Sequence, residues 1–269
     1  MPELQTVPCF SETSHEEEEI CSAPPSSSTE PESEQFTYSF EQTAIIFDWD
    51  DTLLCSSFLS QRNMRLDAPE PSEDILCQLR RLEQSVCGLL KLALRCGRVC
   101  VITNAETGWV QLSAKKWLPQ VVPLLDEITI LSARSTYEAQ FPSSPCQWKT
   151  VAFRDQLSTL FPSELSKNVL SFGDSHVERE AVLTATKELN DVKCKSIKFI
   201  TNPNTEQLVT QIELIYNSLH YLCSHAGDLD LMLTLSLFGN TPLGGESQDG
   251  EYVMESDFES HSMEENTFP

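Results

Sequence analysis

The sequence predicts an α/β protein with a doubly wound, Rossmann-like parallel sheet of five strands and helices on both faces. Short apolar runs recur along the middle of the chain, segments with helical periodicity separate them, and there is no internal repeat. Continuous apolar runs are typical of strands buried on both faces. Strands that alternate with helices favour parallel pairing through right-handed crossovers.

Five apolar runs are the expected strands. The first is a continuous apolar stretch without polar alternation, the others are similar, and the last is the least apolar. They span residues 44–47, 98–103, 127–131, 168–172 and 196–200.

Apolar residues spaced three and four apart predict five helices between and after these runs. The clearest one begins at Ser72, a residue suited to an N-cap, and has Glu73 and Asp74 in its first turn. The second stops at Pro119, because proline does not fit inside a helix. The expected helices span residues 72–95, 111–118, 148–160, 177–189 and 205–223.

The charge is concentrated at the two ends of the chain, which has 18 basic and 41 acidic residues and a net charge of −23. Residues 1–42 contain ten Glu, residues 239–269 contain eight acidic residues, and neither segment contains Lys or Arg. Such segments bury too little surface to offset the entropy of ordering, so we expect two disordered acidic tails. They either solubilise the protein or bind partners, and this charge balance disfavours nucleic-acid binding.

The ten cysteines include no Cys-x-x-Cys pair, and the N-terminus has no basic region followed by an apolar segment. No apolar run approaches the roughly 18 residues of a membrane span. We therefore expect an intracellular protein of the cytoplasm or nucleus, with free thiols and no membrane span.

The expected catalytic domain covers residues 43–225, between the tails. After it, residues 226–238 carry Leu at every second position, a period typical of a half-buried strand. This segment is either an edge strand of the sheet or a strand-forming docking segment for a partner. The leucines are Leu229, Leu231, Leu233, Leu235 and Leu237.

Polar residues suited to phosphoryl transfer follow the expected strands, and ligands of doubly wound sheets bind at these carboxyl ends. Carboxylates from two strands can hold Mg²⁺, and a carboxylate can attack phosphorus. A second carboxyl can protonate the leaving oxygen and later activate water. The residues are Asp48, Asp50, Thr103, Asn104, Asp174 and, at the start of an intervening helix, Lys149.

Four motifs resemble those of the haloacid-dehalogenase superfamily. Residues 45–54, Ile-Ile-Phe-Asp-Trp-Asp-Asp-Thr-Leu-Leu, resemble its first signature, an apolar strand followed by Asp-x-Asp-x-Thr. Thr103 resembles the second motif, Lys149 the third, and residues 172–180, with Gly-Asp and a further acid, the fourth. From Asp48 to Thr103, Lys149 and Asp174 the successive spacings are 55, 46 and 25 residues.

The resemblance implies roles for three aspartates. Asp48 would be the nucleophile and a ligand of Mg²⁺. Asp50 would be the general acid and base, with its backbone carbonyl on the metal, and Asp174 would complete the metal site. The acidic side chain at position 50 matches the phosphatases of this superfamily, because dehalogenase members lack an acid there.

The remaining residues would bind phosphate or support the metal. The resemblance implies that Thr103, the amide of Asn104 and the charge of Lys149 bind the phosphoryl oxygens. Glu178 and Ser175 would lie around the metal site, where Glu178 either orients metal-bound water or only favours the start of its helix.

The segments that could hold a cap domain are short. Residues 53–97 and 132–148 are too few for an independent core, so we expect a capless or minimally capped enzyme. An open site suits a phosphate on a large molecule, so we expect a Mg²⁺-dependent phosphomonoester hydrolase that acts on a phosphoprotein or another large substrate through an aspartyl-phosphate. The alternatives are a small-molecule phosphatase and a scaffold protein without turnover. A third alternative, a phosphoacceptor receiver domain, is disfavoured, because receiver domains group their acidic residues differently.

Overall fold

The computed structural model describes residues 38–161, 165–236 and 251–256. The expected N-terminal tail lies outside the described residues up to position 37, and residues 39–42 form a turn that leads into the first strand. Of the expected C-terminal tail, only residues 251–256 are described. They form a strand, so the expectation of disorder does not hold for them.

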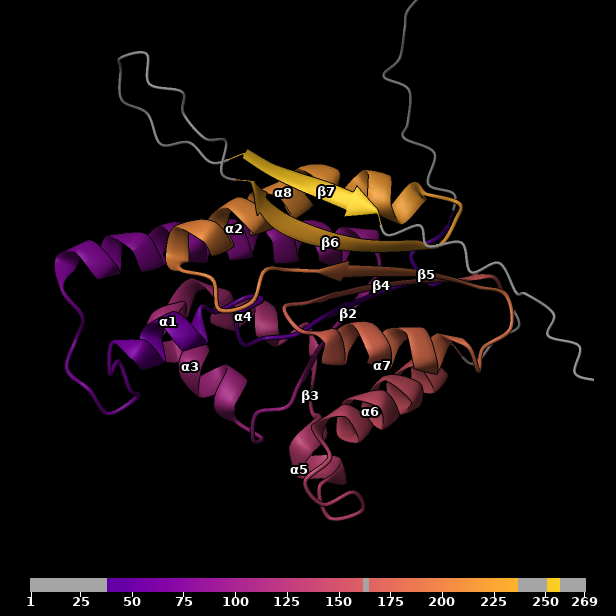
Figure 1. Ribbon diagram of the computed structural model, residues 1–269, viewed down its shortest axis with the longest axis horizontal. Helices are drawn as coiled ribbons and strands as arrows, with labels where there is room; N and C mark the ends of the chain where they lie inside the picture. Colours follow the sequence, from indigo (N-terminus) through magenta and orange to yellow (C-terminus); the bar gives the residue numbers. More distant parts are fainter. Residues whose placement is uncertain (1–37, 162–164, 237–250, 257–269) are drawn as a thin grey trace, which may run out of the picture. The chain divides into compact units, whose positions relative to one another are not determined.

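The described strands form one sheet in the order β3-β2-β1-β4-β5-β6-β7 (Figure 1). All neighbouring pairs are parallel except β6 and β7, which are antiparallel. The strands are β1 (Thr43–Phe47), β2 (Arg98–Thr103), β3 (Thr129–Ser132), β4 (Lys167–Gly173), β5 (Val192–Lys198), β6 (Leu229–Ser236) and β7 (Glu251–Ser256).

The expectation of five parallel strands is wrong in number, because β6 is a sixth parallel strand. The alternating leucines do form a strand as expected, but β6 is not at the edge of the sheet. It pairs with β5 on one side and with β7 on the other. Leu231 and Leu233 of β6 are buried in the main core, which explains the period of two. Leu237 lies outside the described residues.

The described residues contain the five expected helices and four further short ones. The short helices were missed because a helix of three to six residues has too few positions to show a period. The helices are α1 (Ser56–Gln61), α2 (Glu73–Cys96), α3 (Trp109–Trp117), η1 (Pro119–Val121), α4 (Val122–Leu125), α5 (Ala133–Tyr137), α6 (Pro145–Leu160), α7 (His176–Thr186) and α8 (Thr205–Ser224).

Helices cover both faces of the sheet, with α2 and α8 on one face and α6 and α7 on the other (Figure 1). Strand β1 packs against helices on both faces. Ile45 and Phe47 belong to the core beneath α2 and α8, whereas Ala44 and Ile46 belong to the core beneath α6 and α7. Because successive strand residues point to opposite faces, a strand buried on both sides must be apolar throughout. This confirms the prediction for residues 44–47. Strand β3 is less buried, and β5 begins at Val192, four residues before the expected strand, and ends at Lys198, two residues before its expected end.

The order of the strands reverses between β1 and β4. From β1 the chain adds β2 and β3 on one side, and it then returns to place β4 on the other side of β1. Ligands of doubly wound sheets bind at such a switch point, beyond the carboxyl ends of the strands. Asp48 follows β1 and Asp174 follows β4, so both aspartates lie at this point.

Neither crossover near the site contains a separate domain in the part of the chain that the structure describes. The connection from β1 to β2 consists of α1, residues 62–72 and α2, and α2 packs on the sheet. The connection from β3 to β4 contains α5 and α6. In addition, none of the described helices has the length and apolar character needed to cross a membrane.

Candidate phosphate and metal site

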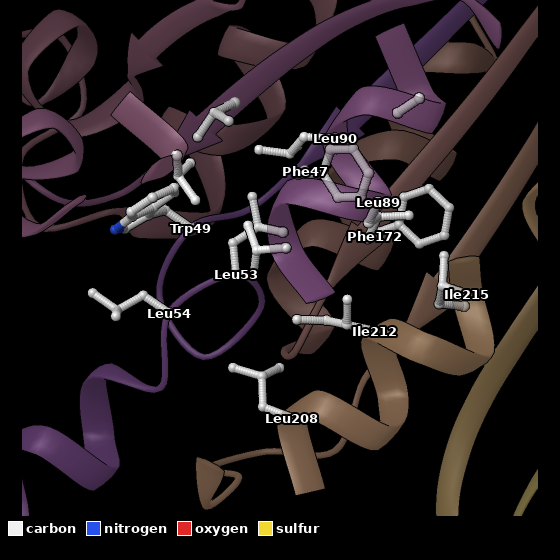
Figure 2. Packing of buried hydrophobic residues seen from close by; sticks show 14 of the residues in the cluster. Phe47, Trp49, Leu53, Leu54, Leu89, Leu90, Phe172, Leu208, Ile212 and Ile215 are labelled. Carbon is white, nitrogen blue, oxygen red and sulfur yellow. The ribbon is translucent and has the colours of Figure 1, made fainter. Parts of the chain in front are cut away.

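A tight loop after β1 presents the first two aspartates. The backbone N–H of Asp48 donates to the carbonyl of Phe172 in β4 at 2.9 Å, and the N–H groups of Leu53 and Leu54 donate to the carbonyl of Trp49 at 2.9 and 3.0 Å. Trp49 is fully buried in the core with Leu53 and Leu54 (Figure 2). These contacts hold the loop on the sheet, so its carboxylates occupy defined positions.

Asp51 shapes this loop. Its φ of 55° lies in the left-handed region, which Asp tolerates better than most residues. Its Oδ1 accepts a hydrogen bond from the backbone N–H of Ser57 in α1 at 2.9 Å. Trp49 anchors the same loop from the other side, because its Nε1 donates to the hydroxyl of Ser113 in α3 at 2.9 Å. Both residues therefore have structural roles in this loop.

A buried lysine and three carboxylates form the centre of the site. Nζ of Lys149, on α6, donates to Oδ1 of Asp48 and to Oε1 of Glu178, each at 2.7 Å. Asp48, Asp174 and Glu178 each have a carboxylate oxygen within 4.8 Å of the others. Only 1% of Lys149 is exposed, and 7% of Asp48. Four charged side chains from β1, β4, α6 and α7 thus meet at the switch point.

The first turn of α7 orients Glu178. Ser175 is the N-cap of this helix, and its hydroxyl and backbone N–H both donate to Oε2 of Glu178 in a capping box. Gly173 permits this close packing, because a Cβ at position 173 would lie 2.4 Å from Cγ of Glu178. The carboxylate of Glu178 therefore caps its own helix with one oxygen and contacts Lys149 with the other.

Burial and the repulsion between neighbouring carboxylates raise the pKa of two of the carboxyl groups. Burial raises the pKa of Asp48 to about 8 against the opposing charge of Lys149, and Glu178 adds to the rise. Burial, with the charges of Glu178 and Asp51, raises the pKa of Asp174 to about 7. Negative charge therefore exceeds what one ammonium group balances.

Lys149 and Glu178 show the opposite effect. Burial acts to lower the pKa of Lys149, but Asp48 and Glu178 outweigh it and hold that pKa above its usual value. Burial acts to raise the pKa of Glu178, but Lys149 and the hydroxyl of Ser175 outweigh it and hold that pKa below its usual value. Lys149 and Glu178 are thus a charged pair at neutral pH.

The carboxylate of Asp50 lies outside this group and has its own partners. Its Oδ1 accepts hydrogen bonds from the hydroxyl of Ser56 and, at 2.8 Å, from Nε1 of Trp109. Its Oδ2 faces the hydroxyl of Thr103 at 3.5 Å. The oxygen Oδ2 is thus less engaged than Oδ1 and is the one more available to a ligand.

Thr103 and Asn104 lie at the end of β2, as expected. The hydroxyl of Thr103 accepts a hydrogen bond from the backbone N–H of Ala105 at 3.0 Å, so Thr103 ends the strand and faces Asp50 at the same time. The side-chain amide of Asn104 donates to the carbonyl of Pro145, the first residue of α6, at 3.4 Å. It thereby links the end of β2 to the helix that carries Lys149.

The structure brings the predicted residues to one end of the sheet and changes their grouping. Asp48, Lys149 and Asp174 meet as expected, and Glu178 joins them through direct contact with Lys149, which the sequence analysis left undecided. An acid in the first helical turn after Asp174 was the available signal. Ser56 and Trp109, which contact Asp50, were not predicted, because hydroxyl and indole groups without a motif carry no such signal.

The donor set of the acidic group suits a hard divalent cation. Asp48, Asp174 and Glu178 offer carboxylate oxygens, which are the ligands that Mg²⁺ and Ca²⁺ prefer. Burial is the main cause of the raised pKa values of Asp48 and Asp174, and nearby carboxylates add to it; a cation would offset the second effect. These three residues can therefore hold a metal ion.

No protein-family model matches the sequence, and no curated protein and no solved structure matches the chain. Function must therefore be argued from the site.

Proposed function

We propose that this protein is a haloacid-dehalogenase-like phosphatase, a Mg²⁺-dependent phosphomonoester hydrolase that forms an aspartyl-phosphate on Asp48. The observation that carries the proposal is the buried pair of Lys149 and Asp48, with Asp174 and Glu178 beside it, at the switch point of the sheet. The motif resemblance supports it, because the residues of all four motifs lie at this end of the sheet.

Asp48 is suited to attack phosphorus. Lys149 holds its Oδ1, which leaves Oδ2 for the attack, and the charge of Lys149 also attracts the phosphate. A Mg²⁺ ion held by Asp48 and Asp174, next to Glu178, would neutralise charge on the phosphoryl oxygens. In the first step the oxygen of Asp48 bonds to phosphorus, and the bond from phosphorus to the ester oxygen breaks.

Asp50 is suited to handle the proton. Because Ser56 and Trp109 occupy Oδ1, Oδ2 is the oxygen that would donate a proton to the departing ester oxygen. In the second step the ionised Asp50 takes a proton from water as that water attacks phosphorus and releases Asp48. One ester and one water thus give one alcohol and one phosphate.

The test is hydrolysis of a panel of aryl and alkyl phosphates by the full-length protein, with Mg²⁺ and with a chelator. We expect metal-dependent release of phosphate, and we expect Asp48→Asn to lower kcat by at least about 10³-fold, as loss of a nucleophile does. The matched control is Asp51→Asn, in the same loop, because Asn also adopts a positive φ and keeps an oxygen for the Ser57 amide.

Asp51→Asn should retain kcat within about fivefold. Absence of turnover across the whole panel would overturn the proposal and favour a scaffold that keeps this fold. Equal losses in Asp48→Asn and Asp51→Asn would also contradict it, because the effect would then come from the loop and not from the nucleophile.

A further inference from the structure

A cavity of about 620 Å³ opens next to two residues that contact Asp50. It lies between α1, the segment that follows α1 and helix α3. Its volume falls within the range of about 300–1,000 Å³ that is typical of small-molecule sites. Its walls include Ser56, Leu59, Ser60, Met64, Trp109 and Trp117.

Two wall residues connect the cavity to the proposed acid. Ser56 and Trp109 line the cavity, and both donate a hydrogen bond to Oδ1 of Asp50. The group that receives a proton from Asp50 is the oxygen of the leaving alcohol. The rest of that alcohol must lie next to Asp50, and the cavity offers it space there.

The inner walls are aromatic and aliphatic. The rings of Trp109 and Trp117 are arranged edge to face with centroids 6.1 Å apart, and Leu59 and Met64 lie nearby. A planar aromatic group packs well against such walls. The other lining residues are polar or charged, apart from Leu66: Ser56, Ser60, Asn63, Arg65 and Asp67.

The outer wall is held in place. Nζ of Lys116, on α3, donates to the carbonyls of Leu66 and Ala68 at 2.9 and 2.6 Å, so the segment after α1 is tied across the cavity to α3. Arg65 and Asp67 form an ion pair in this segment, and both side chains are largely exposed to solvent. The cavity is therefore formed before a ligand arrives, and preorganisation favours binding.

We infer that this cavity is the leaving-group subsite and that it selects phosphate monoesters of phenols, either free aryl phosphates or the side chain of phosphotyrosine. The inference rests on the proposed function and adds the substrate class. In the reaction, the bond from phosphorus to the phenolic oxygen breaks, and the phenolic oxygen takes the proton of Asp50 inside the cavity.

The test uses phosphonates, because they bind without turnover and so exclude differences in leaving-group reactivity. Phenylphosphonate and methylphosphonate are titrated into the full-length protein with Mg²⁺, and binding is followed by the fluorescence of the cavity tryptophans. We expect phenylphosphonate to bind at least tenfold more tightly. This preference should fall at least tenfold in Ser60→Trp, which fills the cavity from α1.

The matched control is Gln61→Trp, because Gln61 is the next residue of α1, is exposed and does not line the cavity. It should keep the preference of the wild type. Leu66→Trp fills the cavity from the opposite wall and should act like Ser60→Trp, so the test does not depend on one variant that folds. Equal effects of Ser60→Trp and Gln61→Trp, or equal affinity for the two phosphonates, would overturn the inference.

The outcome distinguishes this inference from the proposed function. Turnover without a preference for phenylphosphonate would overturn the subsite and leave the phosphatase. Selective binding of phenylphosphonate without turnover of any ester would overturn the phosphatase and leave the cavity as an aryl-phosphate site. Values of kcat/KM for phenyl phosphate and for a phosphotyrosine peptide then distinguish free aryl phosphates from phosphotyrosine as the substrate. An enzyme that acts on free aryl phosphates should have a kcat/KM at least tenfold lower for the peptide.

Discussion

At the scale of single residues, the site combines an excess of carboxylates with one buried ammonium group. Lys149 balances one negative charge, whereas Asp48, Asp174 and Glu178 together supply three once all of them are ionised. Burial raises the pKa of Asp48 to about 8 and that of Asp174 to about 7. Both groups must release their protons before a metal ion binds them, so metal binding and pH are coupled.

This coupling predicts that rising pH destabilises the metal-free protein and increases the stabilisation by Mg²⁺. A carboxyl group has a pKa of about 4 in the unfolded chain, so the unfolded state loses these protons first, and the free energy of unfolding of the metal-free protein falls as pH rises to about 8. The lowered pKa of Glu178 acts in the other direction, but its contribution is complete above about pH 5.

The measurement is the melting temperature with a chelator and with Mg²⁺ at about pH 5.5 and about pH 8.5. The stabilisation by Mg²⁺ should grow with pH, because the cation no longer competes with protons. Asp174→Asn should remove part of this growth. A stabilisation that is the same at both pH values, or that is unchanged in Asp174→Asn, would contradict the placement of the metal at this group.

At the scale of elements, the wall of the cavity depends on one lysine of α3. Lys116 donates to two carbonyls of the segment after α1, whereas its neighbour Lys115 is exposed. A connecting segment held by few contacts opens at low free energy and does so independently of the core. The two hydrogen bonds of Lys116 therefore affect the mobility of residues 62–72 more than the stability of the fold.

We predict that Lys116→Met accelerates amide hydrogen exchange in residues 62–72 and lowers the free energy of unfolding by less than about 1 kcal/mol, because only partly exposed hydrogen bonds are lost. Lys115→Met is the matched control and should leave exchange in this segment unchanged. Hydrogen exchange read by mass spectrometry measures both. Exchange that is equally slow in both variants would show that other contacts hold the wall.

At the scale of the whole molecule, β7 covers the edge of the sheet. Strand β6 pairs with β5 on one side, and the antiparallel β7 pairs with its other side from Leu231 to Ser236. An uncovered strand edge presents unpaired backbone groups that bind other chains. The alternating leucines of β6 would make such an edge especially prone to association.

We therefore predict that a chain truncated after Ser236 self-associates, because β6 becomes an edge. The control is a chain truncated after Ser256, which keeps β7 and should behave like the full-length protein. Size-exclusion chromatography with light scattering measures the oligomeric state of each. A monomeric chain after the first truncation would show that β7 is not needed to protect this edge.

The sequence by itself determined the class of the fold and the charged residues that meet at the switch point. Apolar runs alternate with helical periods, and this local pattern is enough to predict a parallel sheet with covered faces. Because the carboxyl ends of parallel strands share one edge of the sheet, Asp48, Thr103 and Asp174 were expected to lie together there. Lys149 was predicted through its motif, although it lies 101 residues from Asp48.

Only the tertiary structure decided the pairing of β6 and the environment of Asp50. Alternating leucines predict a strand, but they do not specify which strands lie beside it or in which direction. Trp109 contacts Asp50 across 59 residues of sequence, and the cavity exists because α1 and α3 pack with a gap between them. Such contacts depend on how helices pack, and a local period carries no information about that packing.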